Sequence, residues 1–291
     1  MEYQYLLQAI LEGVLLGSIY ALAAMGLALI WGILNLVNFA QADYLMLGMY
    51  ATFWIFYLLG VDPLLSIPIV FALISLLGIL VQRFFIRRIL NAPTLTQVAA
   101  TFGILLILRY SALTIWGPDP RAISTSYTGA IFNFGGILVS YSKLIAFAVT
   151  IASITLLYFF LTYTDVGIAI RATSQNRTAA ELYGINIKKI YMLAFGLGTG
   201  LAGLAGALLS LTYYITPEIG AIFSLTTYVI VVLGGFRSLY GAFLGGIIVG
   251  IVECISALLI TPSMKNIPAY ILFLIVLLIK PTGLFGRKGG I

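Results

Sequence analysis

The sequence predicts an all-α protein, a polytopic bundle of about eight to nine transmembrane helices with some of them broken or re-entrant. Apolar residues make up 62% of the 291 positions, charged residues make up 8%, and the mean hydropathy is +1.13. Soluble domains contain roughly half apolar and a quarter charged residues. Because a soluble fold cannot hide so much apolar surface, lipid must be the main solvent. Residues 1–291 are therefore expected to form a single transmembrane domain.

Nine apolar segments approach or reach the length of about 20 residues that a bilayer crossing requires. In chain order they are Leu6–Leu34, Tyr44–Gly60, Leu64–Gln82, Leu95–Gly117, Leu144–Thr162, Ile190–Tyr214, Ala221–Phe236, Gly241–Ile260 and Ile267–Lys280. Ala221–Phe236 and Ile267–Lys280 are short. The sequence leaves open whether these two cross fully or are kinked, shielded or re-entrant.

The basic residues indicate the orientation of these spans, because cytoplasmic loops are enriched in Lys and Arg. One side carries Arg83, Arg87, Arg88, Arg171, Arg177, Lys188, Lys189, Arg237, Lys280, Arg287 and Lys288, and the other carries Arg121, Lys143 and Lys265. We expect the first side, with the C-terminus, to lie in the cytoplasm, and the N-terminus to lie outside the cell membrane. This distribution explains the net charge of +6, so no nucleic-acid partner is expected. The first five residues lack a basic region, so no cleaved signal peptide is expected.

Two loops are longer than simple connectors. Residues 118–142 lie outside and carry β-forming residues around Gly135 and Gly136, which predicts a short hairpin. This loop is either a docking surface or a linker that seals the bundle. Residues 163–189 lie inside and contain a predicted short helix over Asn176–Gly184. Either Asn176 caps this helix, or Thr178 does so together with Glu181. Because two helical turns are unstable alone in water, the helix needs a partner surface, either a protein or lipid headgroups.

Polar residues interrupt the apolar pattern twice. Since polar groups are costly at membrane depth, each interruption requires a reason. Both could be helix breaks that line a translocation path, as in many transporters, and the first could equally be an ordinary cytoplasmic turn. The path residues are then Asn35, Asn38, Gln41, Asp43, Thr212, Thr216 and Glu218.

Two charges, Arg109 and Glu253, fall within predicted spans. They either pair with each other or Arg109 extends towards the headgroups, and we expect a structural role for both. No metal site is expected, since the chain contains no histidine and no ligand cluster.

Glycines at four-residue spacing predict faces where helices pack closely. The stretch Gly198–Gly203 also matches the dinucleotide fingerprint, but it lies within an apolar helix rather than after a strand, so no dinucleotide is expected. The expected packing residues are Gly196, Gly200, Gly203, Gly206, Gly241 and Gly245.

Several stretches occur in the order found in one transporter family. They are Gly17–Leu22, Asn38–Ala40, Gly167–Gly184, Phe195–Leu208, Leu233–Gly246 and Lys280–Gly286. Over nearly the whole chain, the sequence resembles the permeases of branched-chain amino acid ABC transporters, the LivH-type subunits of high-affinity importers. It departs from the family at Gln41–Asp43, where a His-Gly-acid ending is usual. That difference puts a transferred role for these residues in doubt.

The resemblance implies a subunit that translocates branched-chain or hydrophobic amino acids and is not itself an enzyme. The chain has no phosphate-binding loop, so ATP and Mg²⁺ are expected on two separate cytoplasmic ATPase subunits and no cofactor on this chain. The other implied partners are an extracytoplasmic substrate-binding protein and a second permease, in a heterodimer or a homodimer. The residues implied to couple to the ATPase are Asn176, Arg177, Ala179, Ala180, Glu181 and Gly184.

The sequence leaves two alternative functions open. Related permeases carry urea, short amides or other small polar solutes. A stand-alone, ion-coupled secondary transporter is a different class, which would need carboxylates near the midplane and would have no use for the helix at 176–184.

Overall fold

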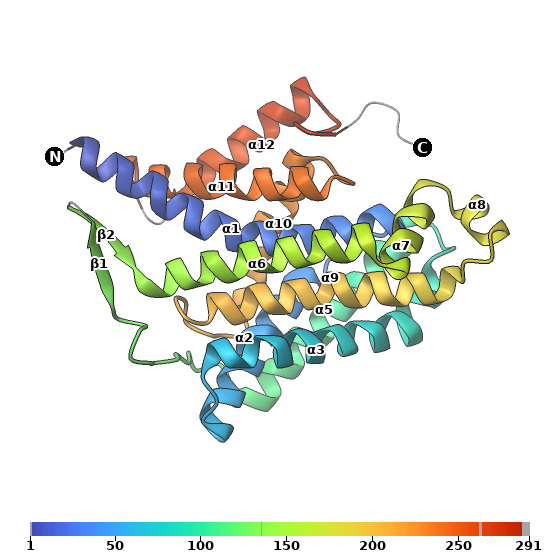
Figure 1. Cartoon of the computed structure of the whole chain (residues 1–291), viewed down its shortest axis with the longest axis horizontal. Coiled ribbons are helices and arrows are strands. Elements are labelled where there is room, and N and C mark those ends of the chain that lie inside the picture. Colours follow the sequence, from blue (N-terminus) through green and yellow to red (C-terminus); the bar gives the residue numbers. More distant parts are fainter. Residues whose placement is uncertain (1, 135, 262–263, 287–291) are drawn as a thin grey trace.

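The computed structural model describes residues 2–134, 136–261 and 264–286. It is a helix bundle with a small hairpin at one end (Figure 1). In chain order its elements are α1 (Glu2–Leu34), α2 (Gln41–Leu59), α3 (Pro63–Val81), the π-helix η1 (Gln82–Ile86), α4 (Arg87–Ile89), α5 (Thr94–Trp116), β1 (Ile131–Phe134), β2 (Ile137–Ser140), α6 (Tyr141–Tyr163), α7 (Asp165–Gln175), α8 (Arg177–Leu182), α9 (Ile187–Leu209), α10 (Ile219–Gly234), α11 (Leu239–Leu259) and α12 (Ile267–Ile279).

The predicted fold class is confirmed. In the described part of the chain, seven helices are long and apolar enough to cross a membrane, and α10 and α12 are shorter apolar helices. The helix ends differ from the predicted spans by a few residues. The largest difference is at α9, which begins at Ile187 and ends at Leu209, five residues before the predicted end. Helix ends are the least certain feature of a hydropathy pattern because polar caps and turns, rather than apolar runs, determine them.

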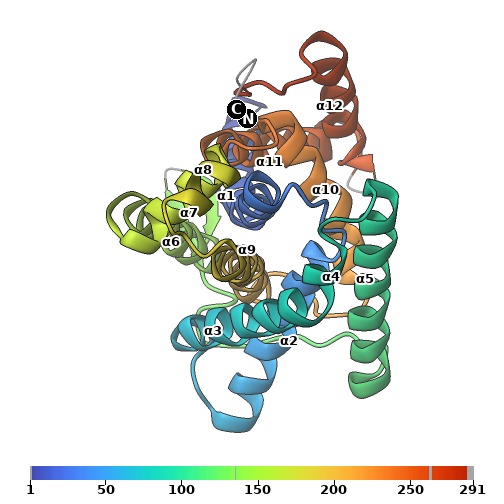
Figure 2. The same cartoon turned by 90° about the vertical axis from the view of Figure 1, so that its right-hand side faces the viewer.

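Two helices form the centre of the bundle. Within an apolar stretch of 18 residues in each helix, 94% of the stretch in α1 and 83% of that in α9 is buried. α1 lies between α9 and α11 in the end-on view (Figure 2). A Cβ on Gly13 would lie 2.5 Å from the Cα of Ile251, and one on Gly246 would lie 2.6 Å from the Cα of Ala21. Lipid provides no hydrophobic drive for helix association, so this close backbone contact is what allows α1 and α11 to pack.

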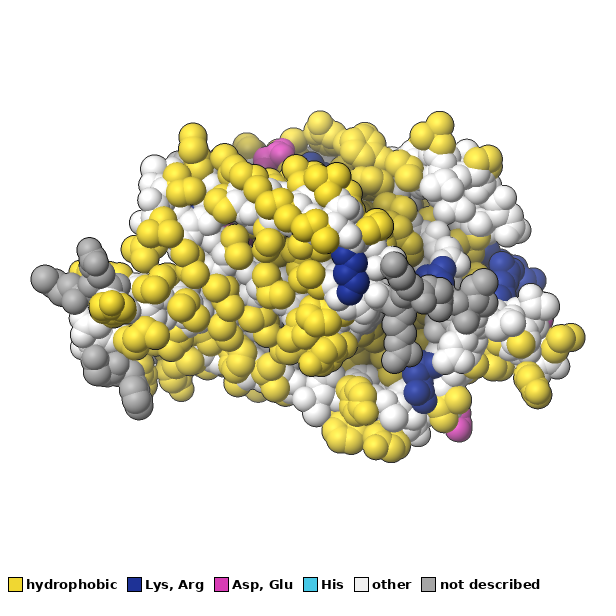
Figure 3. All heavy atoms as spheres, turned by 90° about the horizontal axis from the view of Figure 1, so that it is seen from above, with side chains coloured by type: hydrophobic (Ala, Val, Ile, Leu, Met, Phe, Trp, Pro, Cys, Tyr) yellow, Lys and Arg dark blue, Asp and Glu magenta, His cyan; other side chains and the backbone are white. Residues whose placement is uncertain are grey.

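The outer helices present apolar side chains to their surroundings. On α5, α6 and α12 many large hydrophobic residues are exposed, among them Ile107, Leu156 and Leu278. Hydrophobic side chains cover most of the face in Figure 3, and Lys and Arg gather towards the end where α8 lies. A soluble protein rarely exposes so large an apolar surface. The surface therefore fits a protein surrounded by lipid, with its basic end in water.

The opposite end carries the predicted hairpin. β1 and β2 pair antiparallel, with Ile131 opposite Ser140, which confirms that prediction. The loop before it is tied to the bundle by the hydroxyl of Tyr127, which donates to Oδ1 of Asp62 over 2.9 Å. Burial, together with this hydrogen bond, raises the pKa of Tyr127 to about 12, so the phenol stays a neutral donor at physiological pH.

Candidate functional site

The short helix α8 lies at the basic end of the bundle, connected through α7 to α6 and followed directly by α9. Its cap is Asn176, whose Oδ1 accepts from the backbone N–H of Ala179 over 3.0 Å. The alternative capping pair, Thr178 with Glu181, is not formed. Gly184 has φ +82, the left-handed conformation that ends the segment. Both ends of α8 are therefore fixed by local sequence.

α8 has one face turned inward and one turned away from the bundle. Ala180 is buried, with 4% of its surface exposed, and packs into the core cluster. Leu182 and Tyr183 are 84% and 88% exposed at the other face. Two large apolar side chains held so far out of the bundle provide no stability to the chain alone. They form a surface that a partner can cover.

At the first polar interruption, the chain returns into the bundle after α1 ends at Leu34. Asn35 has φ +52 and stays at the end of α1, where its Oδ1 accepts from Arg237 over 2.6 Å. Gln41, by contrast, is 1% exposed and donates to the carbonyl oxygen of Gly198 over 2.9 Å and to that of Ala23 over 3.5 Å. Ala23 lies about three helical turns before the end of α1. Residues 35–40 therefore form a re-entrant segment rather than an ordinary turn at the end of two full spans.

The side chain of Asn38 belongs to the same buried network. Its Nδ2 donates to Oε1 of Gln41 over 3.1 Å, so the two amides orient each other between α1 and α9. Three buried atoms near this segment have no hydrogen-bond partner among the described residues: Oδ1 of Asn38 and the hydroxyls of Tyr44 and Tyr228. The ring of Tyr228 lies 5.1 Å from that of Phe39, which places α10 beside the segment. Unpaired polar atoms of this kind are suited to contact a polar solute.

The second polar interruption, residues 210–218, leads into α10 and meets the first. A Cβ on Gly220, in the first turn of α10, would lie 2.8 Å from Oδ1 of Asp43 in the first turn of α2. The N-termini of α2 and α10 thus approach one carboxylate, and both helix dipoles favour a negative charge there. Thr212 and Thr216 lie in this segment and are half-buried, and Glu218 is exposed. The structure therefore brings Asp43 together with α10, and Glu218 lies near enough to Asp43 for their charges to interact, whereas Thr212 donates to the carbonyl oxygen of Leu209 over 3.2 Å.

Arg109 completes this meeting point. Its Nε lies 3.1 Å from Oδ1 of Asp43 and its Nη2 lies 3.4 Å from Oδ2. The Asp43 side chain is fully buried and the Arg109 side chain is 15% exposed. A bidentate pair of this kind is strong and directional. Arg109 therefore does not pair with Glu253 and does not extend outward, and both suggestions for it from the sequence are wrong.

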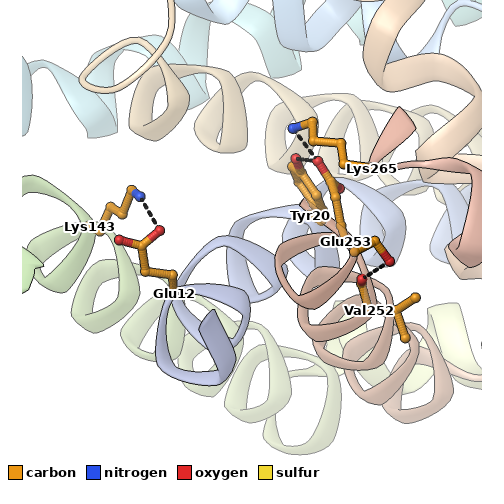
Figure 4. Close-up of polar contacts among 7 residues, drawn as sticks. Glu12, Tyr20, Lys143, Val252, Glu253 and Lys265 are labelled. Carbon is orange, nitrogen blue, oxygen red and sulfur yellow. Dashed lines mark hydrogen bonds and ion pairs between the residues drawn. The ribbon is translucent and has the colours of Figure 1, made fainter. Parts of the chain in front are cut away.

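Glu253 forms a separate cluster, drawn in Figure 4. Its Oε1 lies 2.5 Å from Nζ of Lys265 and accepts from the hydroxyl of Tyr20 over 3.3 Å. Lys265 precedes α12 and Tyr20 is on α1, so the carboxylate links three parts of the chain. Burial alone would lower the pKa of Lys265, but the neighbouring Tyr213 and the Glu253 carboxylate, which accepts a hydrogen bond from the ammonium group, outweigh it and raise that pKa above its usual value. Glu253 is thus held by a cation from a loop, which its place within an apolar run does not indicate.

The predicted packing glycines all lie at helix contacts. Cβ atoms on Gly196 and Gly203 would lie 2.6 Å from Ile79 and 2.7 Å from Ile74 of α3. Gly200 faces Ser75, Gly206 faces the backbone of α2 at Leu45, and Gly241 and Gly245 face the backbone of α10. α9 is therefore held closely against the re-entrant segment, α2 and α3. Among the described residues, no group of three or more His, Cys, Asp or Glu could hold a metal ion.

Comparison with known proteins agrees with this architecture. Residues 9–277 match the family model described as the permease component of branched-chain amino acid transport systems. The chain is 32% identical to the high-affinity branched-chain amino acid transport system permease protein LivH of Salmonella typhimurium, over 98% of this chain and 97% of the relative. It is equally similar to the corresponding protein BraD of Pseudomonas aeruginosa, with the same identity and coverage. A probable LivH of Methanocaldococcus jannaschii is 30% identical over 95% of this chain and 92% of its own length. No solved structure matches.

Proposed function

Because the chain belongs to the family of branched-chain amino acid transport permeases and is a multi-pass membrane protein, we propose that it carries branched-chain amino acids across the cell membrane as one subunit of an ATP-driven importer. The proposed partners are a second permease, two ATPase subunits that hold ATP and Mg²⁺, and an extracytoplasmic substrate-binding protein. The basic end with α8 faces the cytoplasm and the hairpin faces outward, in line with the positions of Lys and Arg.

The observation that carries the proposal is the exposed face of α8. Leu182 and Tyr183 stand away from the bundle, and a helix of six residues is too short to hold its shape without a partner. An ATPase groove that covers them would supply that order. A stand-alone secondary transporter would have no use for such a surface, so this feature favours the ATP-driven importer over that class.

The contacts of α9 provide a route from α8 to the membrane interior. α9 begins five residues after α8 ends, so a displacement of α8 moves the start of α9. Further along α9, the carbonyl oxygen of Gly198 accepts from Gln41 at the re-entrant segment. Two residues beyond Gln41, Asp43 binds Arg109 and meets α10. Nucleotide-dependent closure of the ATPases would thus favour one arrangement of α2 and α10, and hydrolysis would release it.

The substrate passes, in this proposal, beside the buried polar atoms at the start of α2 and in the middle of α10. Asn38, Tyr44 and Tyr228 offer unpaired polar atoms to a zwitterion, and the surrounding walls are apolar. The Asp43–Arg109 pair joins the start of α2, where α10 meets it, to α5, so its separation would accompany an opening between α2 and α5. Discontinuous helices serve this purpose in many transporters.

The proposal is tested by changing the exposed face of α8 without touching its buried face. Leu182→Glu places a charge on the docking surface and should abolish both co-purification of the ATPases and ATP-driven leucine uptake. Leu95→Glu is the matched control, because Leu95 is 80% exposed at the same end of the bundle but outside α8. If Leu182→Glu retains its ATPases and its uptake, or if the chain alone transports leucine without ATP, the proposal is wrong.

A further inference from the structure

A cavity of about 480 Å³ lies at the α8 end of the bundle. It is open on one side and lies between η1 and α4 on one wall and α8 with the start of α9 on the other. Its volume is within the range of about 300–1,000 Å³ that is typical of small-molecule sites. The residues with polar side-chain groups that line it are Gln82, Arg87, Asn91, Arg177, Glu181, Asn186, Lys188 and Tyr191.

The charges of the lining favour an anionic group. Arg87, Arg177 and Lys188 contribute three positive charges, and Glu181 contributes one negative charge. Arg177 is held in place because its guanidinium lies 5.5 Å from the centroid of the Tyr191 ring. Guanidinium groups bind carboxylates and phosphates through paired hydrogen bonds. The first requirement for a ligand is therefore a carboxylate or a similar anion.

Gln82 adds a second and opposite requirement. Its side chain is 1% exposed, it lines the cavity, and its Oε1 has no hydrogen-bond partner among the described residues. A buried carbonyl oxygen without a partner is unfavourable, so the ligand should supply a hydrogen-bond donor. Gln82 also begins the π-helix η1, and π-turns within helices are frequent at functional sites. An α-amino acid carries both a carboxylate and an ammonium group that donates hydrogen bonds, whereas an inorganic anion carries no cationic donor.

We propose that this cavity binds a free α-amino acid. The carboxylate binds Arg87, Arg177 and Lys188, the ammonium group donates to Oε1 of Gln82 beside Glu181, and an apolar side chain packs on Leu90 and Ile185. This inference rests on the proposed function, because the ligand is the product that the importer delivers to this side of the membrane.

Binding there would couple the product concentration to transport. The cavity joins α8, through Arg177 and Glu181, to η1 and α4, through Gln82 and Arg87. A ligand that contacts both sides holds α8 against the bundle. Because transport requires α8 to move with the ATPases, accumulated amino acid slows further uptake. The site is therefore an inhibitory product site, separate from the path at α2 and α10.

The test uses the complete importer in proteoliposomes, with ATP and either leucine or sucrose inside and labelled leucine with the binding protein outside. Internal leucine should lower the initial uptake rate of the wild type several-fold. Gln82→Leu should keep the wild-type rate in sucrose-loaded vesicles and lose the inhibition. Gln8→Leu, which makes the same change at the far end of α1, should behave as the wild type. Arg87→Gln provides a second test of the cavity if Gln82→Leu assembles poorly.

Each other outcome has a distinct meaning. Absence of leucine uptake by the wild type contradicts the proposed function rather than the cavity. Normal uptake that internal leucine does not slow overturns the product site, as does equal inhibition of wild type, Gln82→Leu and Arg87→Gln. Internal phosphate that inhibits as strongly as leucine would show a general anion site and overturn the amino acid. A loss of uptake by Arg87→Gln in sucrose-loaded vesicles would instead indicate that an acidic residue of the ATPase fills the cavity.

Discussion

At the scale of single residues, the Asp43–Arg109 pair places two opposite charges inside the bundle. The carboxylate is fully buried, and it is stabilised by a two-point contact with the guanidinium and by two helix N-termini. Taking a charge out of water is costly, and removal of one partner leaves the other charge uncompensated. The pair is therefore sensitive to the loss of either member and less sensitive to the loss of both.

We expect Asp43→Asn to destabilise the protein by about 3–5 kcal/mol, because Arg109 then lies largely buried without its anion. The double variant Asp43→Asn with Arg109→Gln should recover most of this stability. Its leucine uptake should stay low, since the contact at the meeting of α2 and α10 is absent. Thermal unfolding in detergent measures the first effect, and uptake in proteoliposomes measures the second.

A partly exposed ion pair serves as the control. Nζ of Lys143 lies 3.3 Å from Oε2 of Glu12, and both side chains are a quarter to a third exposed. Glu12→Gln should cost no more than about 1 kcal/mol, because solvent screens such a pair. A double variant no more stable than Asp43→Asn alone would contradict the assignment of the pair as a mutually compensating buried contact.

At the scale of elements, close glycine contacts explain how α9 is held. The backbones of α2 and α9 meet at Gly48 and Gly203, where a Cβ on Gly48 would lie 2.7 Å from the Cα of Gly203. The neighbour is backbone rather than a flexible side chain, so it cannot move aside without shifting a helix. Such a contact fixes the distance between α2 and α9.

Gly48→Ala should therefore destabilise the bundle by about 1–3 kcal/mol through overpacking. Gly103→Ala is the matched control, because Gly103 is also within a membrane helix but a Cβ there would meet nothing within 4 Å. The unfolding temperature in detergent and the yield of assembled importer are the measurements. Equal behaviour of the two variants would contradict the role given to close backbone contact.

At the scale of the whole molecule, the central helices α1 and α9 differ in role from α2 and α10. α1 and α9 are almost enclosed by the other helices and form a rigid centre. α2 and α10 begin inside the bundle, after segments that are not helical, and their starts face each other across Asp43. This arrangement puts irregular backbone only where protein surrounds it, as the cost of unpaired peptide groups in lipid requires.

The proposed orientation can be tested because the chain has a single cysteine, Cys254. In a Cys254→Ser background, Thr178→Cys places a thiol on α8 and Asp119→Cys places one in the loop before the hairpin, where both positions are exposed. A membrane-impermeant maleimide should label Asp119→Cys in intact cells and label Thr178→Cys only after the membrane is opened. The reverse pattern would place α8 outside and exclude its contact with an ATPase.

The features that depend on composition and on neighbouring residues could be predicted from the amino-acid sequence. The apolar content predicted a lipid-embedded bundle, and the β-forming residues around Gly135 and Gly136 predicted the hairpin. For α8 it offered two caps, and the structure uses Asn176. These properties act over a few residues, or over the chain as a whole, so they can be inferred without knowledge of which helices are neighbours.

The partners of the buried polar groups could not be predicted and become apparent in the folded bundle. Arg109 binds a carboxylate 66 positions away, and Glu253 binds Lys265 and a tyrosine on α1. The hydroxyls of Tyr44 and Tyr228 are buried without a hydrogen-bond partner in the described part of the chain, although aromatic residues in such a chain are typical interface anchors. Polar groups are drawn together inside a membrane protein because lipid offers them no partners, and which groups meet depends on how the helices pack.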